Sequence, residues 1–318
     1  YINWGINMIG DMQRWTPNVA SIIEHAKEFH PKKEVISRMV SGDIHRTNYD
    51  EVCIRSRKLA SALEKDGYKK GDVIATLALN TYRHLEMYYG ISGMGAICHT
   101  LNFRLHPEQA VYIINHADDK IIFCEVPFIP IMEGLKDQLP CVEKYIILCD
   151  EADMPETGLK NAISYEEYIS NGDEDYVWPA LDDDAACGLC YTSGTTGNPK
   201  GVLYSHKSNI LHAQASLVGM PIGPDEAILM VVPLFHVLAW GIPYYGPMHG
   251  SKLVMPGMQM EGEPLYDLID KEKVTLAFGV PTIWMGLLAY CRDNNKILTS
   301  VKNTIIGGSA LSLPTLQE

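Results

Sequence analysis

Residues 191–202 have the sequence YTSGTTGNPKGV, which holds five hydroxyl side chains, three glycines and one lysine. Apolar segments at 185–189 and 202–204 flank this run. Glycine lets backbone N–H groups turn toward a ligand, and hydroxyls with a lysine ammonium complete a cradle for a polyphosphate anion. A plain surface turn is the alternative, but a turn needs only about two to five such residues and no lysine at a fixed place. The run therefore predicts a phosphate-binding loop.

This loop is not a Walker A motif, which requires Gly-x-x-x-x-Gly-Lys followed by Ser or Thr. Here Gly197 is followed by Asn198, and Lys200 is followed by Gly201. The sequence thus excludes an ordinary P-loop kinase or ATPase.

Apolar segments of strand length alternate with helical patterns on both sides of the loop. This alternation predicts parallel sheets with helices on both faces. The hydroxyl or amide side chains of Asn48, Ser164 and Ser205 are placed to cap helices, and Pro281 suits a first helical turn. Strands are predicted over residues 73–79, 96–100, 120–125, 145–149, 227–232, 252–255, 274–280 and 303–306, and helices over 52–67, 80–93, 106–117, 206–217 and 265–273 and from Pro281 onward.

The composition limits the classes of function. The 318 residues are 47% hydrophobic and 20% charged, which suffices for a full core. A net charge of −13 argues against a nucleic-acid-binding surface. No apolar stretch is long enough to predict a membrane span. Eight scattered cysteines and the lack of a recognisable secretory signal predict a cytoplasmic location.

Two short clusters resemble metal or redox sites but have plainer explanations. Cys187 and Cys190 have the C-x-x-C spacing, yet no second pair or histidine cluster accompanies them, so we expect buried thiols. Residues 182–184 are three aspartates in an acidic stretch, for which a solvated linker is the expectation. No His-Glu-x-x-His run supports a zinc hydrolase.

The run at 191–202 closely resembles the phosphate loop of the adenylate-forming superfamily, which includes acyl-CoA synthetases, luciferases and adenylation domains of peptide synthetases. These enzymes use ATP to turn a carboxylate into an acyl-adenylate that a thiol then attacks. The resemblance implies that Lys200 offsets charge as pyrophosphate leaves, and that the Thr192 hydroxyl is a Mg²⁺ ligand. The loop residues implied to bind ATP are Thr192, Ser193, Gly194, Thr195, Thr196, Gly197 and Lys200.

Residues 233–240, PLFHVLAW, resemble the second signature of this superfamily, whose His–aromatic segment borders the carboxylate pocket. The resemblance implies that His236 takes part in catalysis, and that His236, Ala239 and Trp240 shape the acid site. Amino-acid-activating relatives tend to carry Asp in this segment, so His236 favours a plain carboxylic acid. A core histidine with a packing tryptophan is the alternative.

Two glycine-containing turns complete the resemblance. Val280 and Pro281, in the sequence GVPT, resemble a wall of the acid pocket, although alone they are a strand-to-helix turn. Gly307, Gly308 and Ser309 resemble the turn that meets adenine and the acyl carbonyl, with Gly308 also facing the acid. The same turn also partly matches the nucleophile elbow of serine hydrolases, Gly-x-Ser-x-Gly, but this chain has Leu at position 311 and neither Asp nor His in residues 310–318. The sequence therefore does not support a hydrolase.

We therefore expect an α/β fold with two doubly wound, mostly parallel sheets and flanking helices. Residues 1–318 would form a truncated AMP-binding N-terminal domain, with one subdomain at about 71–210 and another at about 12–66 plus 211–318. The remaining barrel and the C-terminal domain would lie beyond residue 318.

The expected function is ATP- and Mg²⁺-dependent activation of a fatty or other apolar carboxylic acid, followed by thioester formation with coenzyme A. Two alternatives stay open. One is a catalytically incomplete nucleotide-binding fragment, and the other is activation of a different acid, such as a short or thioether acid. The expected partners are the small-molecule substrates and, as one possibility, a second copy in a homodimer.

Overall fold

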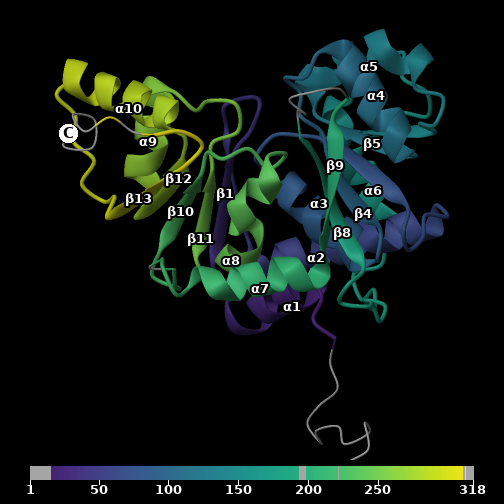
Figure 1. Cartoon of the computed structure of the whole chain (residues 1–318), viewed down its shortest axis with the longest axis horizontal. Helices are drawn as coiled ribbons and strands as arrows, with labels where there is room; N and C mark the ends of the chain where they lie inside the picture. The colour runs from purple at the N-terminus through teal and green to yellow at the C-terminus, as the bar shows by residue number, and fades with distance from the viewer. Residues whose placement is uncertain (1–15, 193–197, 221, 311, 313–318) are drawn as a thin grey trace, which may run out of the picture.

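The computed structural model describes residues 16–192, 198–220, 222–310 and 312, and it contains two sheets (Figure 1). Every strand pair is parallel except β1–β2 in the first sheet and β8–β9 in the second. The predicted fold of two mostly parallel sheets with flanking helices is confirmed. The first sheet has the order β13 (Asn303–Ile306), β12 (Leu276–Gly279), β10 (Ala227–Met230), β11 (Lys252–Met255), β1 (Glu34–Arg38), β2 (Ile44–Asn48). The second has the order β7 (Ile163–Ser164), β6 (Lys144–Ile147), β5 (Ile121–Cys124), β3 (Val73–Leu77), β4 (Ile97–Thr100), β8 (Ala186–Thr192), β9 (Lys200–Ser205).

Helices lie between the two sheets and on both outer faces (Figure 1). The shared core between the sheets contains side chains of strands from both, together with α1 (Ala20–Phe29), α2 (Tyr49–Lys65), α3 (Tyr82–Gly93), α6 (Tyr165–Ser170), α7 (His206–Ser216) and α8 (Ile242–Met248). On the outer faces, the second sheet is covered by α4 (Pro107–Ala117) and α5 (Ile129–Leu135), and the first sheet is covered by α9 (Gly262–Glu272) and α10 (Pro281–Asp293). Every residue of α3 is buried, which makes it the centre of the shared layer.

Short one-turn helices complete the chain: η1 (Val126–Phe128), η2 (Lys136–Gln138), η3 (Glu151–Asp153) and η4 (Val237–Gly241). Among the described residues, no helix is long and apolar enough to cross a membrane.

The predicted helix starts are confirmed at three caps. Asn48 accepts a hydrogen bond from the Glu51 amide at 3.0 Å, and Ser164 and Ser205 cap α6 and α7 in the same way. Each cap satisfies one of the amide groups that a helix start leaves unpaired. Pro281 stands in the first turn of α10, where its missing N–H costs nothing.

Element ends differ from the predicted ones where tertiary contacts take over the backbone. β3 stops at Leu77, because the Leu79 amide donates to the Glu125 carboxylate at 3.2 Å instead of continuing the sheet. α9 begins at Gly262 rather than at residue 265, with Pro264 inside its first turn. The hairpin β1–β2 has no predicted counterpart, since β2 is partly exposed, mostly polar and lacks an apolar pattern.

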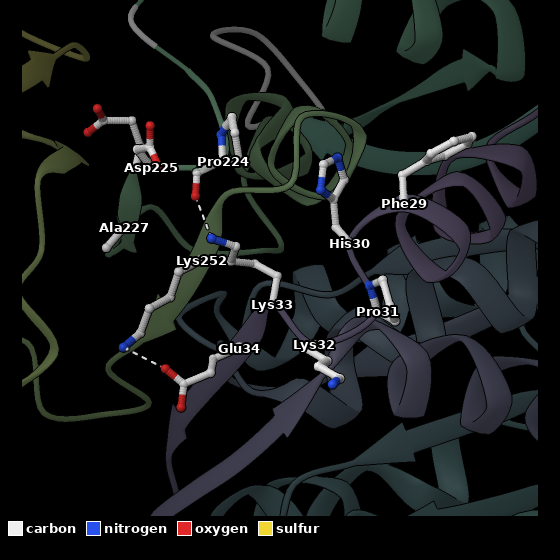
Figure 2. Close-up of a pocket in the computed structure, with 11 residues that line it drawn as sticks. Phe29, His30, Pro31, Lys32, Lys33, Glu34, Pro224, Asp225, Ala227 and Lys252 are labelled. Carbon is white, nitrogen blue, oxygen red and sulfur yellow. Dashed lines mark hydrogen bonds and ion pairs between the residues drawn. The ribbon is translucent and has the colours of Figure 1, made fainter.

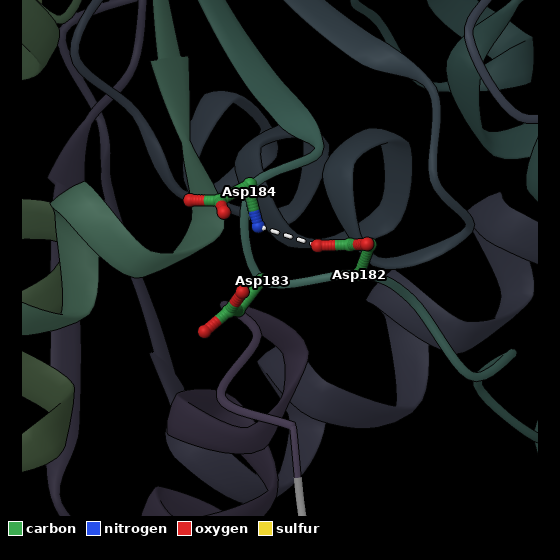
Figure 3. Close-up of side chains that lie close together, drawn as sticks. All are labelled: Asp182, Asp183 and Asp184. Atoms are coloured by element: carbon green, nitrogen blue, oxygen red, sulfur yellow. Dashed lines mark hydrogen bonds between the residues drawn. The ribbon is translucent and has the colours of Figure 1, made fainter. Parts of the chain in front are cut away.

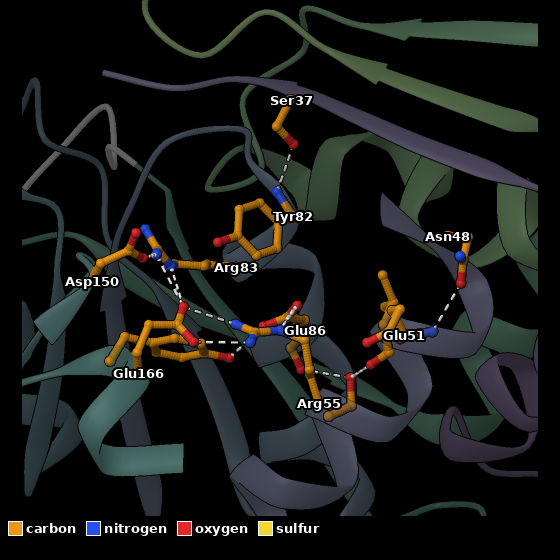
Figure 4. Close-up of polar contacts among 12 residues, drawn as sticks. Ser37, Asn48, Glu51, Arg55, Tyr82, Arg83, Glu86, Asp150 and Glu166 are labelled. Carbon is orange, nitrogen blue, oxygen red and sulfur yellow. Dashed lines mark hydrogen bonds and ion pairs between the residues drawn. The ribbon is translucent and has the colours of Figure 1, made fainter. Parts of the chain in front are cut away.

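Buried and partly buried charges in the central layer form an ion-pair network that joins three helices (Figure 4). Arg55 on α2 lies 2.7 Å from Glu86 on α3, and it also binds Glu166 on α6 with two hydrogen bonds. Arg83 binds Glu166 and Asp150. Burial raises the pKa of Glu86, and the neighbouring Arg55 opposes this rise. Paired and hydrogen-bonded in this way, the charges can occupy a layer that would otherwise exclude them.

Candidate nucleotide and carboxylate site

Asn80 is one of the buried side chains that join the two sheets near their carboxyl ends. It follows β3 of the second sheet and is 2% exposed. Its amide nitrogen donates to the carbonyl oxygens of Met230 and Val232 at 2.7 and 2.8 Å, at the end of β10 in the first sheet. Its amide oxygen accepts from the Leu234 amide at 2.9 Å. Asn80 therefore fixes the segment that leads into the predicted acid-binding signature.

The predicted phosphate loop joins β8 to β9 as an antiparallel hairpin. Thr192 pairs with Lys200 across its base, and the Thr192 hydroxyl lies 3.5 Å from the Lys200 carbonyl oxygen. Both side chains are exposed, so they are free to meet a ligand at the end of the sheet. The other predicted loop residues, Ser193, Gly194, Thr195, Thr196 and Gly197, lie outside the described residues.

Part of the predicted acid-binding signature folds as a left-handed turn, η4. Its first four residues, Val237–Trp240, all have φ between 47° and 55°, a region that L-residues avoid. Leu238 packs on Gly188 of β8, where an added Cβ would lie 3.2 Å from a Leu238 methyl group. The Cys190 thiol contacts the backbone of Val237 and Leu238. The turn is thereby docked against the strand that leads into the phosphate loop.

The glycine-rich turn after β13 lies against the same signature. A Cβ on Gly307 would lie 2.8 Å from the Trp240 ring, and the Gly307 amide donates to the Gly279 carbonyl at 3.3 Å. A Cβ on Gly308, whose φ is 83°, would lie 3.2 Å from a methyl group of Val280. Three segments far apart in the sequence thus meet around Trp240 and Val280.

The predicted site residues differ in exposure. His236, Gly308 and Ser309 are exposed, Val280 is 36% exposed, and Trp240 and Gly307 are half-buried. Ala239 is fully buried and Pro281 is buried at the start of α10, so these two act through packing in this conformation. Among the described residues, no hydrogen bond or ion pair joins Thr192 or Lys200 to the turn at 307–309.

The contacts of the cysteine pair at 187 and 190 and of the three aspartates at 182–184 agree with the plainer explanations given for them. Cys187 and Cys190 are buried free thiols, as predicted, and burial raises the pKa of Cys187 to about 12. Asp183 and Asp184 each lie 3.0 Å from Lys207, while Asp182 accepts from the Asp184 amide at 2.9 Å (Figure 3).

A cavity of about 860 Å³ lies at the opposite, amino ends of β1, β10 and β11 (Figure 2). Two of its three lysines are engaged: Lys33 donates to the Pro224 carbonyl, and Lys252 lies 3.0 Å from Glu34. None of the predicted site residues lines it. It is therefore separate from the candidate site.

The fold is that of the N-terminal domain of an adenylate-forming enzyme, and the predicted acid-binding turn is docked in it against the strand that leads into the predicted phosphate loop. Residues 23–318 match the family model described as AMP-binding enzyme. The chain belongs to this family.

Two curated relatives match nearly the whole chain. A medium-chain-fatty-acid–CoA ligase of Ectopseudomonas oleovorans is 44% identical over 313 residues, covering 98% of this chain and 57% of that protein. A 3-methylmercaptopropionyl-CoA ligase of Ruegeria lacuscaerulensis is 45% identical over 305 residues, covering 95% of this chain and 57% of that protein. The chain thus spans somewhat more than half the length of these relatives.

Solved structures agree on the fold. The anthranilate CoA ligase AuaEII, in complex with anthranoyl-AMP, superposes with a TM-score of 0.84 at 22% identity, over 94% of this chain and 56% of that chain. The N-terminal domain of FACL13 from Mycobacterium tuberculosis gives 0.81 at 22% identity, over 95% and 72%.

Sequence reasoning missed Asn80 and a group of residues behind the phosphate loop, namely His99, Asp119 and Tyr191. Asn80 lies three residues after the end of β3, in the region where ligand-facing or bridging polar groups of parallel sheets occur. The partners of all four residues lie in other elements of the chain, so no local pattern indicates their role.

Proposed function

We propose that the enzyme containing this chain uses ATP to convert an apolar carboxylic acid into an acyl-adenylate, and then transfers the acyl group to coenzyme A. In the first step, an acid oxygen bonds to the α-phosphorus and pyrophosphate leaves. In the second step, the thiol sulfur bonds to the acyl carbonyl carbon and AMP leaves. The observation that supports the proposal is the docking of η4, part of the predicted acid signature, on β8, the strand that leads into the predicted phosphate loop.

The predicted site residues that the structure describes have the following roles in this proposal. The Lys200 ammonium, exposed at the base of the loop, offsets the negative charge that develops on the departing pyrophosphate. His236 and Trp240 border the acid, and the turn at 307–309 meets the adenine and the acyl carbonyl. The apolar neighbours of Trp240 and the lack of an acidic residue in 233–240 favour an uncharged acyl chain.

The exposed Thr192 hydroxyl suits Mg²⁺, which takes a few protein oxygens and otherwise keeps water and phosphate ligands. When bound, the ion would neutralise charge on the phosphate oxygens. The subdomain boundaries, the cytoplasmic location and a homodimer stay predictions from the sequence.

The test is ATP–pyrophosphate exchange by the complete enzyme with Lys200→Ala. Loss of a charge-assisted contact to the departing group should slow exchange by roughly 10²–10³-fold. Lys302→Ala, which removes an exposed lysine beside Glu226, is the matched control and should leave the rate unchanged. Equal rates in a folded Lys200→Ala variant and the wild type would overturn the assignment.

Two acid classes compete as substrates. A straight-chain fatty acid fits the relative from Ectopseudomonas, and a short thioether acid fits the relative from Ruegeria. A panel of fatty acids, 3-methylmercaptopropionate and amino acids of similar size would rank them. We expect both acid classes to outcompete the amino acids, because a site without a buried carboxylate leaves a substrate ammonium unpaired. A panel led by amino acids would refute this.

A further inference from the structure

Tyr191, the residue before Thr192 on β8, is held from two sides by histidines of neighbouring elements. Its hydroxyl oxygen lies 2.6 Å from Nδ1 of His116, in the last turn of α4. Its ring centroid lies 5.1 Å from that of His99, on β4. Burial raises the pKa of Tyr191 to about 12, so the hydroxyl stays protonated at neutral pH in its hydrogen bond with Nδ1 of His116. The side chain is thus fixed at its tip and on its flank.

The histidine on the flank is itself oriented by a buried carboxyl group. Nδ1 of His99 lies 2.8 Å from Oδ2 of Asp119, and both side chains are 0% exposed. Among the described residues, Nε2 of His99 and Oδ1 of Asp119 have no hydrogen-bond partner. A buried polar pair that is incompletely satisfied costs stability compared with two aliphatic side chains. What the pair supplies instead is one fixed orientation of the imidazole beside Tyr191.

Tyr191 also contacts the returning strand of the hairpin. Its partner on β9 is Gly201, where an added Cβ would lie 3.2 Å from Cζ of the Tyr191 ring. Gly201 follows Lys200, and Lys200 pairs with Thr192. The ring therefore rests on the backbone next to both ends of the phosphate loop.

We propose that Tyr191, His116 and the His99–Asp119 pair are positioning residues for the phosphate loop. They fix the base of the β8–β9 hairpin, so that Thr192 and Lys200 present their side chains to the nucleotide phosphates in one geometry. The nucleotide in this inference rests on the proposed function. The anchoring of the hairpin base does not, and it can be measured without a ligand.

The first measurement is amide hydrogen exchange along the hairpin in Tyr191→Phe, His116→Leu and the double variant. Each single variant removes the same hydrogen bond, so exchange at residues 191–192 and 200–201 should be about three to ten times faster. The double variant should be no faster than either single one, because the two changes act on one bond. Tyr204→Phe is the control: it removes a hydroxyl from the same hairpin, opposite Gly188 at the far end, and should leave the base unchanged.

A merely structural role would give a different pattern, in which exchange accelerates evenly along β8 and β9 in step with the loss of global stability. That pattern, or no acceleration at all, would overturn the anchoring.

The second measurement is titration of the complete enzyme with ATP and Mg²⁺. We expect the dissociation constant of Tyr191→Phe to rise three- to tenfold while Tyr204→Phe matches the wild type. Failure of the wild type to bind ATP would contradict the proposed function, and the exchange experiment would still decide the anchoring. Unchanged ATP affinity in Tyr191→Phe, with accelerated exchange at the hairpin base, would overturn the positioning role alone.

Discussion

Replacing Asn80 by alanine should destabilise the protein far more than its small size suggests. The change removes three hydrogen bonds of 2.7 to 2.9 Å from a residue that is 2% exposed. Each such bond contributes about 0.5–1.5 kcal/mol, and buried partners left unpaired add to the loss. We therefore expect the free energy of unfolding to fall by about 3–5 kcal/mol. That is a large part of the stability of a typical domain, about 5–15 kcal/mol.

The assay is urea unfolding, comparing midpoints and slopes so that a change in the unfolded state is recognised. Asn80→Asp is an informative second variant, because it keeps the acceptor for the Leu234 amide. It places a carboxylate against the carbonyl oxygens of Met230 and Val232, so it should be no better than alanine. Asn303→Ala, on the exposed part of β13, is the control and should change stability by less than about 0.5 kcal/mol. A decrease in the free energy of unfolding of less than about 1 kcal/mol in Asn80→Ala would refute the stabilising role of its hydrogen bonds between the two sheets.

Three further perturbations test the site and its surroundings. Burial raises the pKa of Glu125 from its ordinary value of 4.5 to about 7, so the folded chain holds this proton to higher pH than the unfolded chain. As the pH rises from about 4.5 to 7, the wild type should therefore lose up to about 3 kcal/mol of stability relative to Glu125→Gln. A constant difference between the urea midpoints of the two proteins over this pH range would contradict the raised pKa. Gly241→Ala should lower the melting temperature, because φ is 82° and the new Cβ would lie 2.5 Å from His212. Adding His212→Ala should relieve the clash and restore part of the melting temperature, but the cost of the left-handed backbone should remain. Full restoration of the melting temperature would argue against backbone strain. Gly307→Ala should destabilise less in a Trp240→Phe background than in the wild type, and strict additivity of the two changes in urea unfolding would show that the residues do not touch.

The regular part of the fold was predictable because its signals are local. Apolar runs placed β11 and β13 with their observed bounds, and Asn48, Ser164 and Ser205 marked helix starts through their own side chains. Periodicity and capping act within a few residues, so one sequence suffices to detect them.

The parts that were not predicted depend on contacts across the chain. The sequence shows that β8 precedes a glycine-rich loop, but not that β9 returns antiparallel to it. The residues of η4 were expected to border an acid pocket, but nothing in the sequence indicated their left-handed backbone. The bonds of Asn80 join residues about 150 positions apart, and a single sequence carries no signal of such pairs.

The strain in η4 explains why glycines occur where they do around the candidate site. Four consecutive left-handed residues cost roughly 1–2 kcal/mol each compared with the right-handed form. The surroundings must therefore hold the turn, and Leu238 and Ala239 do so by being almost fully buried. Leu238 reaches its place because Gly188 has no side chain, and Trp240 reaches its place because Gly307 has none. Strain of this kind persists where the structure over-determines a conformation, and it concentrates at functional sites. We therefore expect Gly188 and Gly307 to matter for the predicted acid site as much as His236 and Trp240 do.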